Sequence, residues 1–303
     1  MARPRRFVDA HVHLWDLGKI AHPWLTPPFS DGGVMGSVEA IATDYLLDDY
    51  LADAEGWNVT GMVHVDAGAA PDAAVDETAW LQGIAEERGM PQAIVAFAAL
   101  DAAGLDDVLA LQASFANVRG IRQIANYHAD SGKTYTSRNL LDDEAWRRGY
   151  AKLARHGLSF DLQIYPGQMK AAAAFVVRHP EIPVILNHAG MPVELGKEGF
   201  AEWCEGMAAL AEVPHVSAKI SGFGIVDHDW TEASIRSHVL TCIDLFGTDR
   251  AMFASDFPTD KLFGSFDRHL KAYDAITANF SDDERDALFA ANAERIYRLG
   301  AAS

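Results

Sequence analysis

The stretch that decides the fold is Phe7-Val8-Asp9-Ala10-His11-Val12-His13-Leu14-Trp15, an apolar, strand-like run interrupted by histidine. Successive side chains of a strand point to opposite faces, so His11 and His13 share one face. Their backbone positions lie about 6.6 Å apart, which lets two imidazole rings converge on one metal ion or one substrate atom. Core packing does not explain two histidines on one face of a strand. The run therefore predicts a strand that also carries chemistry.

The rest of the chain repeats a strand–helix alternation. Short apolar, β-branched runs predict eight strands, at residues 7–15, 58–66, 93–100, 118–124, 158–165, 183–188, 215–221 and 251–256. Between and after them, helical periodicity predicts helices at residues 72–88, 104–115, 144–156, 168–179, 200–211, 231–245, 266–279 and 282–299, the last of which closes the ring. Eight such units in about 250 residues imply an α/β fold, a single (β/α)8 TIM barrel. We assign residues 1–303 to this one domain.

Composition limits the classes of function. The chain of 303 residues is 49% hydrophobic and 22% charged, which is typical of a globular protein with a large core. Its net charge of −18 disfavours partners such as nucleic acid and anionic membranes. No apolar run approaches the ~18 residues of a membrane span, and Cys204 and Cys242 are expected to be reduced thiols. We expect a cytoplasmic protein, and the sequence leaves monomer and homo-oligomer open.

Polar residues interrupt the apolar runs where a TIM barrel places its chemistry, at the carboxyl ends of the strands. An ionisable group in such a run is costly unless it has a task or a partner. Besides the two histidines of the first strand, the candidates are Arg122, Gln163, Tyr165, Asn187, His188, Lys219, Ser221 and Asp256.

Two loops add candidates with open alternatives. The Gly- and Pro-rich segment 17–44 follows the first strand and is expected to cover the barrel mouth with Trp24. His128, after the fourth strand, either contacts substrate or lies on the surface.

Two of the strand residues also have open alternatives. Arg122 either binds substrate or pairs with a barrel carboxylate such as Asp161, and Lys219 either binds substrate or is structural.

At these residues the chain resembles the amidohydrolase superfamily, and within it the amidohydrolase-2 branch of sugar-lactone and dicarboxylate-lactone hydrolases. The resemblance covers residues 7–299. It is carried by His11-Val12-His13 on the first strand, Asn187-His188-Ala189-Gly190 after the sixth, and Ser255-Asp256-Phe257-Pro258 after the eighth. The resemblance implies that His11, His13, His188 and Asp256 form the catalytic site and are the candidate ligands of a metal.

The chain departs from the superfamily at two positions. Binuclear members carry a bridging Lys or Glu on the fourth strand, where this chain has Arg122 and Gln123. Most mononuclear members carry a histidine after the fifth strand, where this chain has Gln163, and an amide oxygen is a poorer zinc ligand than imidazole. We therefore expect either one divalent metal, zinc as first choice, or no metal.

The resemblance and the residues together predict a hydrolase that opens a small lactone. Asp256 is the expected general base that activates water, and His11, His13 and His188 act as ligands or hydrogen-bond donors. Arg122, Lys219, Gln163, Tyr165, His128 and Trp24 are the expected substrate contacts. The first-choice substrate is an aldonolactone and the second is a dicarboxylate lactone. The alternatives are a metal-dependent decarboxylase of the same superfamily and a non-catalytic ligand-binding barrel.

Overall fold

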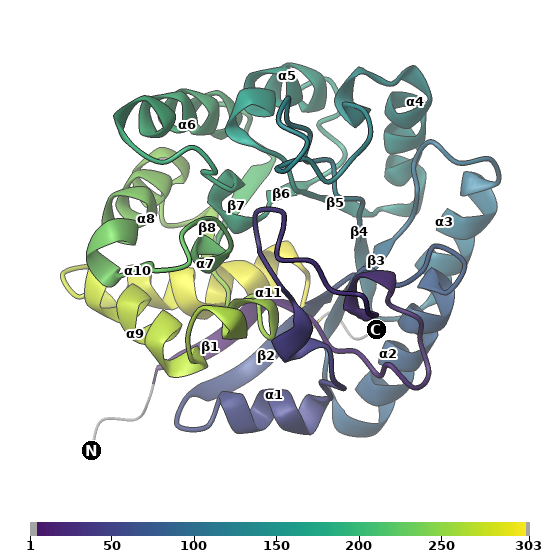
Figure 1. Ribbon diagram of the computed structural model, residues 1–303, viewed down its shortest axis with the longest axis horizontal. Coiled ribbons are helices and arrows are strands. Elements are labelled where there is room, and N and C mark those ends of the chain that lie inside the picture. Colours follow the sequence, from purple (N-terminus) through teal and green to yellow (C-terminus); the bar gives the residue numbers. More distant parts are fainter. Residues whose placement is uncertain (1–4, 301–303) are drawn as a thin grey trace.

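Eight parallel strands pair side by side in chain order, as the ring at the centre of Figure 1 shows. The structure is a computed structural model and describes residues 5–300. The strands are β1 (Arg6–Val12), β2 (Asn58–Val65), β3 (Ala93–Phe97), β4 (Val118–Arg122), β5 (Ser159–Leu162), β6 (Val184–Leu186), β7 (Val216–Ile220) and β8 (Ala251–Phe253). β8 returns to β1 through a parallel bridge between Phe257 and Val12, which brings the two ends of the sheet together. The predicted TIM barrel is confirmed.

Helices surround the sheet and bury its outer face (Figure 1). They are α1 (Leu47–Asp53), α2 (Ala74–Arg88), α3 (Leu105–Ser114), α4 (Glu144–Lys152), α5 (Pro166–Val176), α6 (Lys197–Ala211), α7 (Phe223–Val226), α8 (Glu232–Phe246), α9 (Phe266–Ile276), α10 (Asp282–Asp286) and α11 (Asn292–Ile296). Short 3-10 helices are η1 (Pro23–Leu25), η2 (Glu39–Ile41), η3 (Leu140–Asp142), η4 (Leu153–His156), η5 (His188–Gly190) and η6 (Thr259–Leu262). Among the described residues, no helix is long and apolar enough to cross a membrane.

The predicted last helix is divided into α10, a π-helical turn η7 (Ala287–Ala291) and α11. η7 packs against β1 and β8 and so completes the ring. Just beyond α11, the Tyr297 side chain packs with the residues that fill the barrel interior, and its hydroxyl reaches Asp161 of β5.

A β-bulge in β1 turns the two histidines into the barrel. Asp9 pairs with Met62 but Val12 pairs with His64, so β1 has one more residue than β2 over this interval. Before the bulge, Phe7 packs outward on Phe266 and Asp9 accepts a hydrogen bond from Tyr50 of α1. Strict alternation would also send His11 and His13 outward. The extra residue reverses the faces, and both rings point toward the barrel interior.

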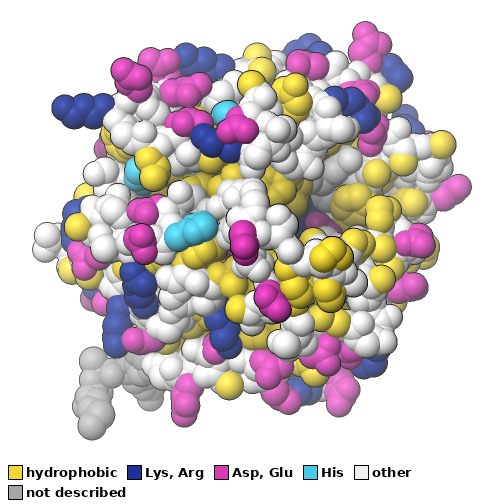
Figure 2. All heavy atoms as spheres, in the orientation of Figure 1, with side chains coloured by type: hydrophobic (Ala, Val, Ile, Leu, Met, Phe, Trp, Pro, Cys, Tyr) yellow, Lys and Arg dark blue, Asp and Glu magenta, His cyan; other side chains and the backbone are white. Residues whose placement is uncertain are grey.

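The segment between β1 and α1 lies over the barrel mouth. Its ends are joined by an antiparallel bridge between Trp15 and Tyr45, and its middle is held by a hydrogen bond from His228 to the Val34 carbonyl, 2.9 Å long. In Figure 1 this dark purple segment crosses in front of the strands. Figure 2 shows hydrophobic side chains around a hollow at the centre of this face and charged side chains mostly toward its edge. The predicted mouth cover is thus in place, although the sequence did not predict α1.

Two helical glycines give a matched test of the packing of the helices. In α4, a Cβ on Gly149 would lie 1.8 Å from the Leu100 carbonyl oxygen, whereas in α2 a Cβ on Gly83 would meet nothing within 4 Å. We expect Gly149→Ala to lower the free energy of unfolding by about 3 kcal/mol or more. Gly83→Ala should raise it by about 0.5–1 kcal/mol. Urea unfolding measures both, and equal midpoints for the two variants would contradict this packing.

Candidate active site

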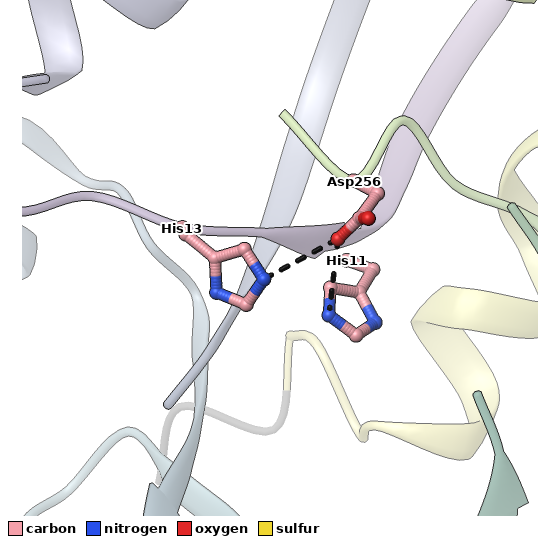
Figure 3. A group of neighbouring side chains, drawn as sticks. All are labelled: His11, His13 and Asp256. Atoms are coloured by element: carbon pink, nitrogen blue, oxygen red, sulfur yellow. Dashed lines mark ion pairs between the residues drawn. The ribbon is translucent and has the colours of Figure 1, made fainter. Parts of the chain in front are cut away.

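Two histidines and one aspartate converge above the barrel interior (Figure 3). Nε2 of His11 lies 3.5 Å and Nε2 of His13 lies 3.3 Å from Oδ1 of Asp256. His188 approaches from β6, with its Nδ1 3.9 Å from Oδ2 of Asp256. All four residues are at most 5% exposed. The structure therefore brings together the four residues that the resemblance identified as catalytic.

The backbone that positions these groups adopts a locally strained conformation. Asp256 has φ 58° and His188 has φ 54°, a left-handed conformation that is strained for side chains other than glycine. Ala189 and Met191 continue the left-handed turn after β6, with φ 47° each. Neighbouring Gly222 has to lack a side chain, because its Cβ would lie 2.6 Å from Nδ1 of His188. Strained residues gather at functional sites where the surrounding structure can hold them.

Burial controls the protonation of the cluster. It lowers the pKa of His13 to about 3 and that of His188 to about 4. Burial also lowers the pKa of His11 well below its usual range, and the nearby Lys219 adds to this effect. Burial raises the pKa of Asp256, while the positive charges of Arg122 and Lys219 act against the rise. Near neutral pH the cluster therefore consists of neutral imidazoles around a carboxyl group.

A cavity of about 280 Å³ opens beside the cluster, just below the ~300–1,000 Å³ typical of small-molecule sites. Six predicted residues line it: His13, Trp24, Arg122, Gln163, His188 and Asp256. Trp24 is held at the mouth by a hydrogen bond from its Nε1 to the Ala67 carbonyl, 2.8 Å long.

The cavity also has walls that the sequence interpretation missed: Met35, Ala67, Gly68, Ile124, Tyr135, Ile225 and Thr259. Most belong to loops or short helices after the strands, where neither an apolar run nor a motif marks them. The Gly- and Pro-rich composition of the segment 17–44 was the one available signal, and it predicted a cover without distinguishing Met35.

Arg122 already has partners inside the site. Its Nε and Nη2 each lie 3.2 Å from Oδ2 of Asp66, and Nη2 also donates to the Asp66 carbonyl. Its Nη1 donates to Oε1 of Gln163 at 3.1 Å. The carboxylate that pairs with Arg122 is thus Asp66 of the β2–α2 loop, and not Asp161. The amide oxygen of Gln163 is engaged by Arg122.

Three predicted substrate contacts lie away from the cavity. Lys219 is fully buried, with Nζ 2.6 Å from Oδ2 of Asp161. Tyr165 is also buried and donates through its hydroxyl to the Lys133 carbonyl. His128 is half-buried, and its Nε2 lies 3.4 Å from Glu194. None of the three lines the cavity, and their partners are protein groups. That they contact substrate stays a prediction.

The donors present fit one divalent ion. His11, His13 and Asp256 each offer a ligand atom, and these atoms lie within 4.8 Å of one another. Within residues 5–300, Nε2 of His11 and both carboxylate oxygens of Asp256 have no hydrogen-bond partner. Buried polar atoms without partners call for an explanation, and a bound ion is one that fits imidazole and carboxylate atoms facing one another. Two imidazoles and one carboxylate form a donor set that is used in catalytic zinc sites. His188 does not belong to this set of three.

Known proteins resemble the chain over nearly its whole length. An uncharacterized protein, y4mH, of Sinorhizobium fredii (strain NBRC 101917 / NGR234) is 44% identical over 296 residues, which are 96% of this chain and 98% of that protein. An L-fucono-1,5-lactonase of Burkholderia multivorans (strain ATCC 17616 / 249) is 30% identical over 306 residues, covering 96% of each chain.

A solved structure of an amidohydrolase from Burkholderia multivorans with bound Zn has a TM-score of 0.79 and 26% identity, covering 98% of this chain and 100% of that chain. The sequence profile of the family described as amidohydrolase matches residues 8–299, which include His11, His13 and the Asp256 loop. With the barrel and the histidine–aspartate cluster in place, the chain belongs to the amidohydrolase family.

Proposed function

We propose that the protein hydrolyses a small, neutral, sugar-type lactone, with Asp256 as the general base. The observation that carries this proposal is the buried Asp256 carboxyl, which faces the cavity and whose two oxygens have no hydrogen-bond partner within residues 5–300. A carboxylate in this setting can accept a proton from water. The relatives named L-fucono-1,5-lactonase, 30% and 26% identical to this chain, support a lactone as substrate.

The reaction needs one proton to move twice. Asp256 takes a proton from water as the water oxygen attacks the lactone carbonyl. The ring C–O bond then breaks, and Asp256 returns the proton to the leaving alkoxide, which gives an open-chain hydroxy acid. Arg122 lines the same cavity, and the guanidinium N–H that Asp66 and Gln163 leave free can donate to the oxyanion that forms at the carbonyl. A divalent ion held by His11, His13 and Asp256, with zinc as our first choice, supplies Lewis-acid polarisation of the carbonyl when bound.

The charges at the site favour a neutral lactone over a dicarboxylate. Arg122 and Asp256 are the only residues with full charges on the described cavity wall. Asp66 compensates the charge of Arg122, and Lys219 lies outside the wall, paired with Asp161. A substrate with two carboxylates would therefore meet no free cation there. The apolar side chains of Trp24 and its neighbours suit the C–H face of a sugar ring.

The test is a substrate screen with the purified protein, with and without a chelator. We expect faster opening of neutral aldono-1,4- and 1,5-lactones than of a dicarboxylate lactone, followed by NMR so that the spontaneous reaction can be subtracted. Preference for the dicarboxylate lactone would overturn the charge argument. Release of CO₂ from an unsaturated or aromatic acid, with no lactone opened, would identify a decarboxylase. Ligand binding without any turnover would identify a non-catalytic barrel.

A further inference from the structure

A row of buried polar groups runs beneath the cavity and ends at His11. The Tyr297 hydroxyl lies 3.0 Å from both carboxylate oxygens of Asp161. Oδ2 of Asp161 accepts from Nζ of Lys219 at 2.6 Å, and the same Nζ lies 3.4 Å from Nδ1 of His11. All four side chains are at most 1% exposed. The groups come from four separate parts of the chain, so the barrel has to close before the row exists.

The contact between Lys219 and His11 is unusual for a metal-binding histidine. Such a ring normally donates its second N–H to a carbonyl or carboxylate, which leaves the other nitrogen free to bind the ion. His13 follows this rule, since its Nδ1 lies 2.7 Å from the Val65 carbonyl. His11 does not, because a lysine ammonium has only protons to donate. Asp161 holds Lys219 as an ammonium at 2.6 Å, so the 3.4 Å contact between Nζ and Nδ1 fits a His11 ring whose Nδ1 accepts a hydrogen bond.

We propose that Lys219, held by Asp161 and Tyr297, is a positioning residue that keeps neutral His11 in the tautomer with its proton on Nε2. That nitrogen faces Oδ1 of Asp256 at 3.5 Å (Figure 3). His11 then offers an N–H toward the carboxylate that accepts the proton of water. A divalent ion at His11 needs the Nε2 lone pair, so the ring proton would first have to move to Nδ1, where it would break the hydrogen bond from Lys219. The row therefore weakens metal binding.

The proposal has a structural and a catalytic part. The tautomer and the metal affinity depend on the contacts alone. The effect on catalysis rests on the proposed lactone opening. If no lactone is opened, the tautomer and the zinc affinity still test the role of Lys219, so the two failures can be told apart.

The test compares wild type with Lys219→Met and with Lys219→Met/Asp161→Asn, in which no buried carboxylate is left without its cation. A matched control exists at the surface. Lys261 pairs with Asp53 at 2.7 Å and lies 5.5 Å from the ring of Tyr45, whose hydroxyl donates to Asp53. Lys261→Met removes the same charge from the same kind of cluster outside the site.

The first readout is the imidazole ¹⁵N spectrum of the chelator-treated protein, with His11 assigned by a His11→Asn variant. We expect a protonated Nε2 and an unprotonated Nδ1 in wild type and in Lys261→Met. Both Lys219 variants should show a population with the proton on Nδ1. A wild-type His11 that carries its proton on Nδ1 would overturn the proposal.

The second readout is the zinc dissociation constant, measured by competition with a chelating dye. Replacing groups that contact metal-binding histidines typically changes metal affinity 10–100-fold. Here we expect zinc to bind about 10-fold more tightly or better in the Lys219 variants, and unchanged in Lys261→Met. If Lys219 is only structural, its loss lowers the melting temperature while zinc affinity stays equal or falls, and either result rejects the proposal. Should Lys219→Met fail to fold, the double variant decides.

Discussion

Lactone opening should fall by about 10²–10⁴-fold in kcat when Asp256 is replaced by asparagine, because the amide has the same shape but cannot accept the proton of water. The pH profile gives a second readout. Burial raises the pKa of Asp256 above its usual 3.8, and a base works only when deprotonated. In wild type, kcat/KM should therefore rise with pH through a limb that lies above pH 3.8, and Asp256→Asn should lack this limb.

Asp260 provides the control for this prediction. Its carboxyl is also fully buried, with a raised pKa caused mainly by burial, but it does not line the cavity. Asp260→Asn should keep both the activity and the acidic limb. Rates are measured at saturating zinc and again with chelator, which separates the loss of the base from the loss of an ion. An Asp256→Asn enzyme within tenfold of wild type under both conditions would show that another group activates the water.

Replacing Arg122 with methionine should lower the free energy of unfolding by about 3–5 kcal/mol. The side chains of Arg122 and Asp66 are 5% and 3% exposed, so the substitution leaves a buried carboxylate without its cation. Asp66→Asn should lower the free energy of unfolding by a similar amount, since it leaves the guanidinium without a carboxylate partner. Breaking a buried pair is far more costly than replacing both partners together.

The double variant Arg122→Met/Asp66→Asn tests this reasoning. An asparagine oxygen can still accept the hydrogen bond from the Gly68 N–H that Oδ1 of Asp66 accepts at 3.0 Å. The double variant should therefore be more stable than either single variant, as measured by urea unfolding of the four proteins. If its loss equals the sum of the two single losses, the two charges do not interact, and the argument for a compensated Arg122 fails.

The barrel could be predicted because each strand is a short apolar run between helical stretches, and all eight strands are confirmed. The residues at which the strands end were predicted less accurately. β5 ends at Leu162 and β8 at Phe253, earlier than the predicted 165 and 256. After β8 the backbone leaves the extended conformation, with Asp256 at φ 58°. Apolar residues continue through such turns, so the pattern overestimates the length of the strand.

The site shows a second limit of the alternation argument. It correctly predicts that His11 and His13 share a face, but it also places them with Phe7, which packs outward. The bulge that reverses the faces depends on buried contacts made by Asp9, which accepts from the backbone N–H of His11 at 3.3 Å and of Ser255 at 2.9 Å. The contact with Ser255 joins positions far apart in the chain, and local sequence does not reveal it. For the same reason it could not identify the carboxylates that pair with Arg122 and Lys219.

The closure of the barrel has a consequence for the order in which the protein is made. β1 leaves the ribosome first, yet its inward turn is secured by Ser255, and the bridge from Val12 to Phe257 closes the sheet. Tyr297, which supports the groups below His11, is synthesised still later. Until Tyr297 has been synthesised, His11 and His13 are present in the nascent chain but the site around them is incomplete. Catalytic competence therefore has to wait until the chain has been synthesised through Tyr297 and the last helix can dock.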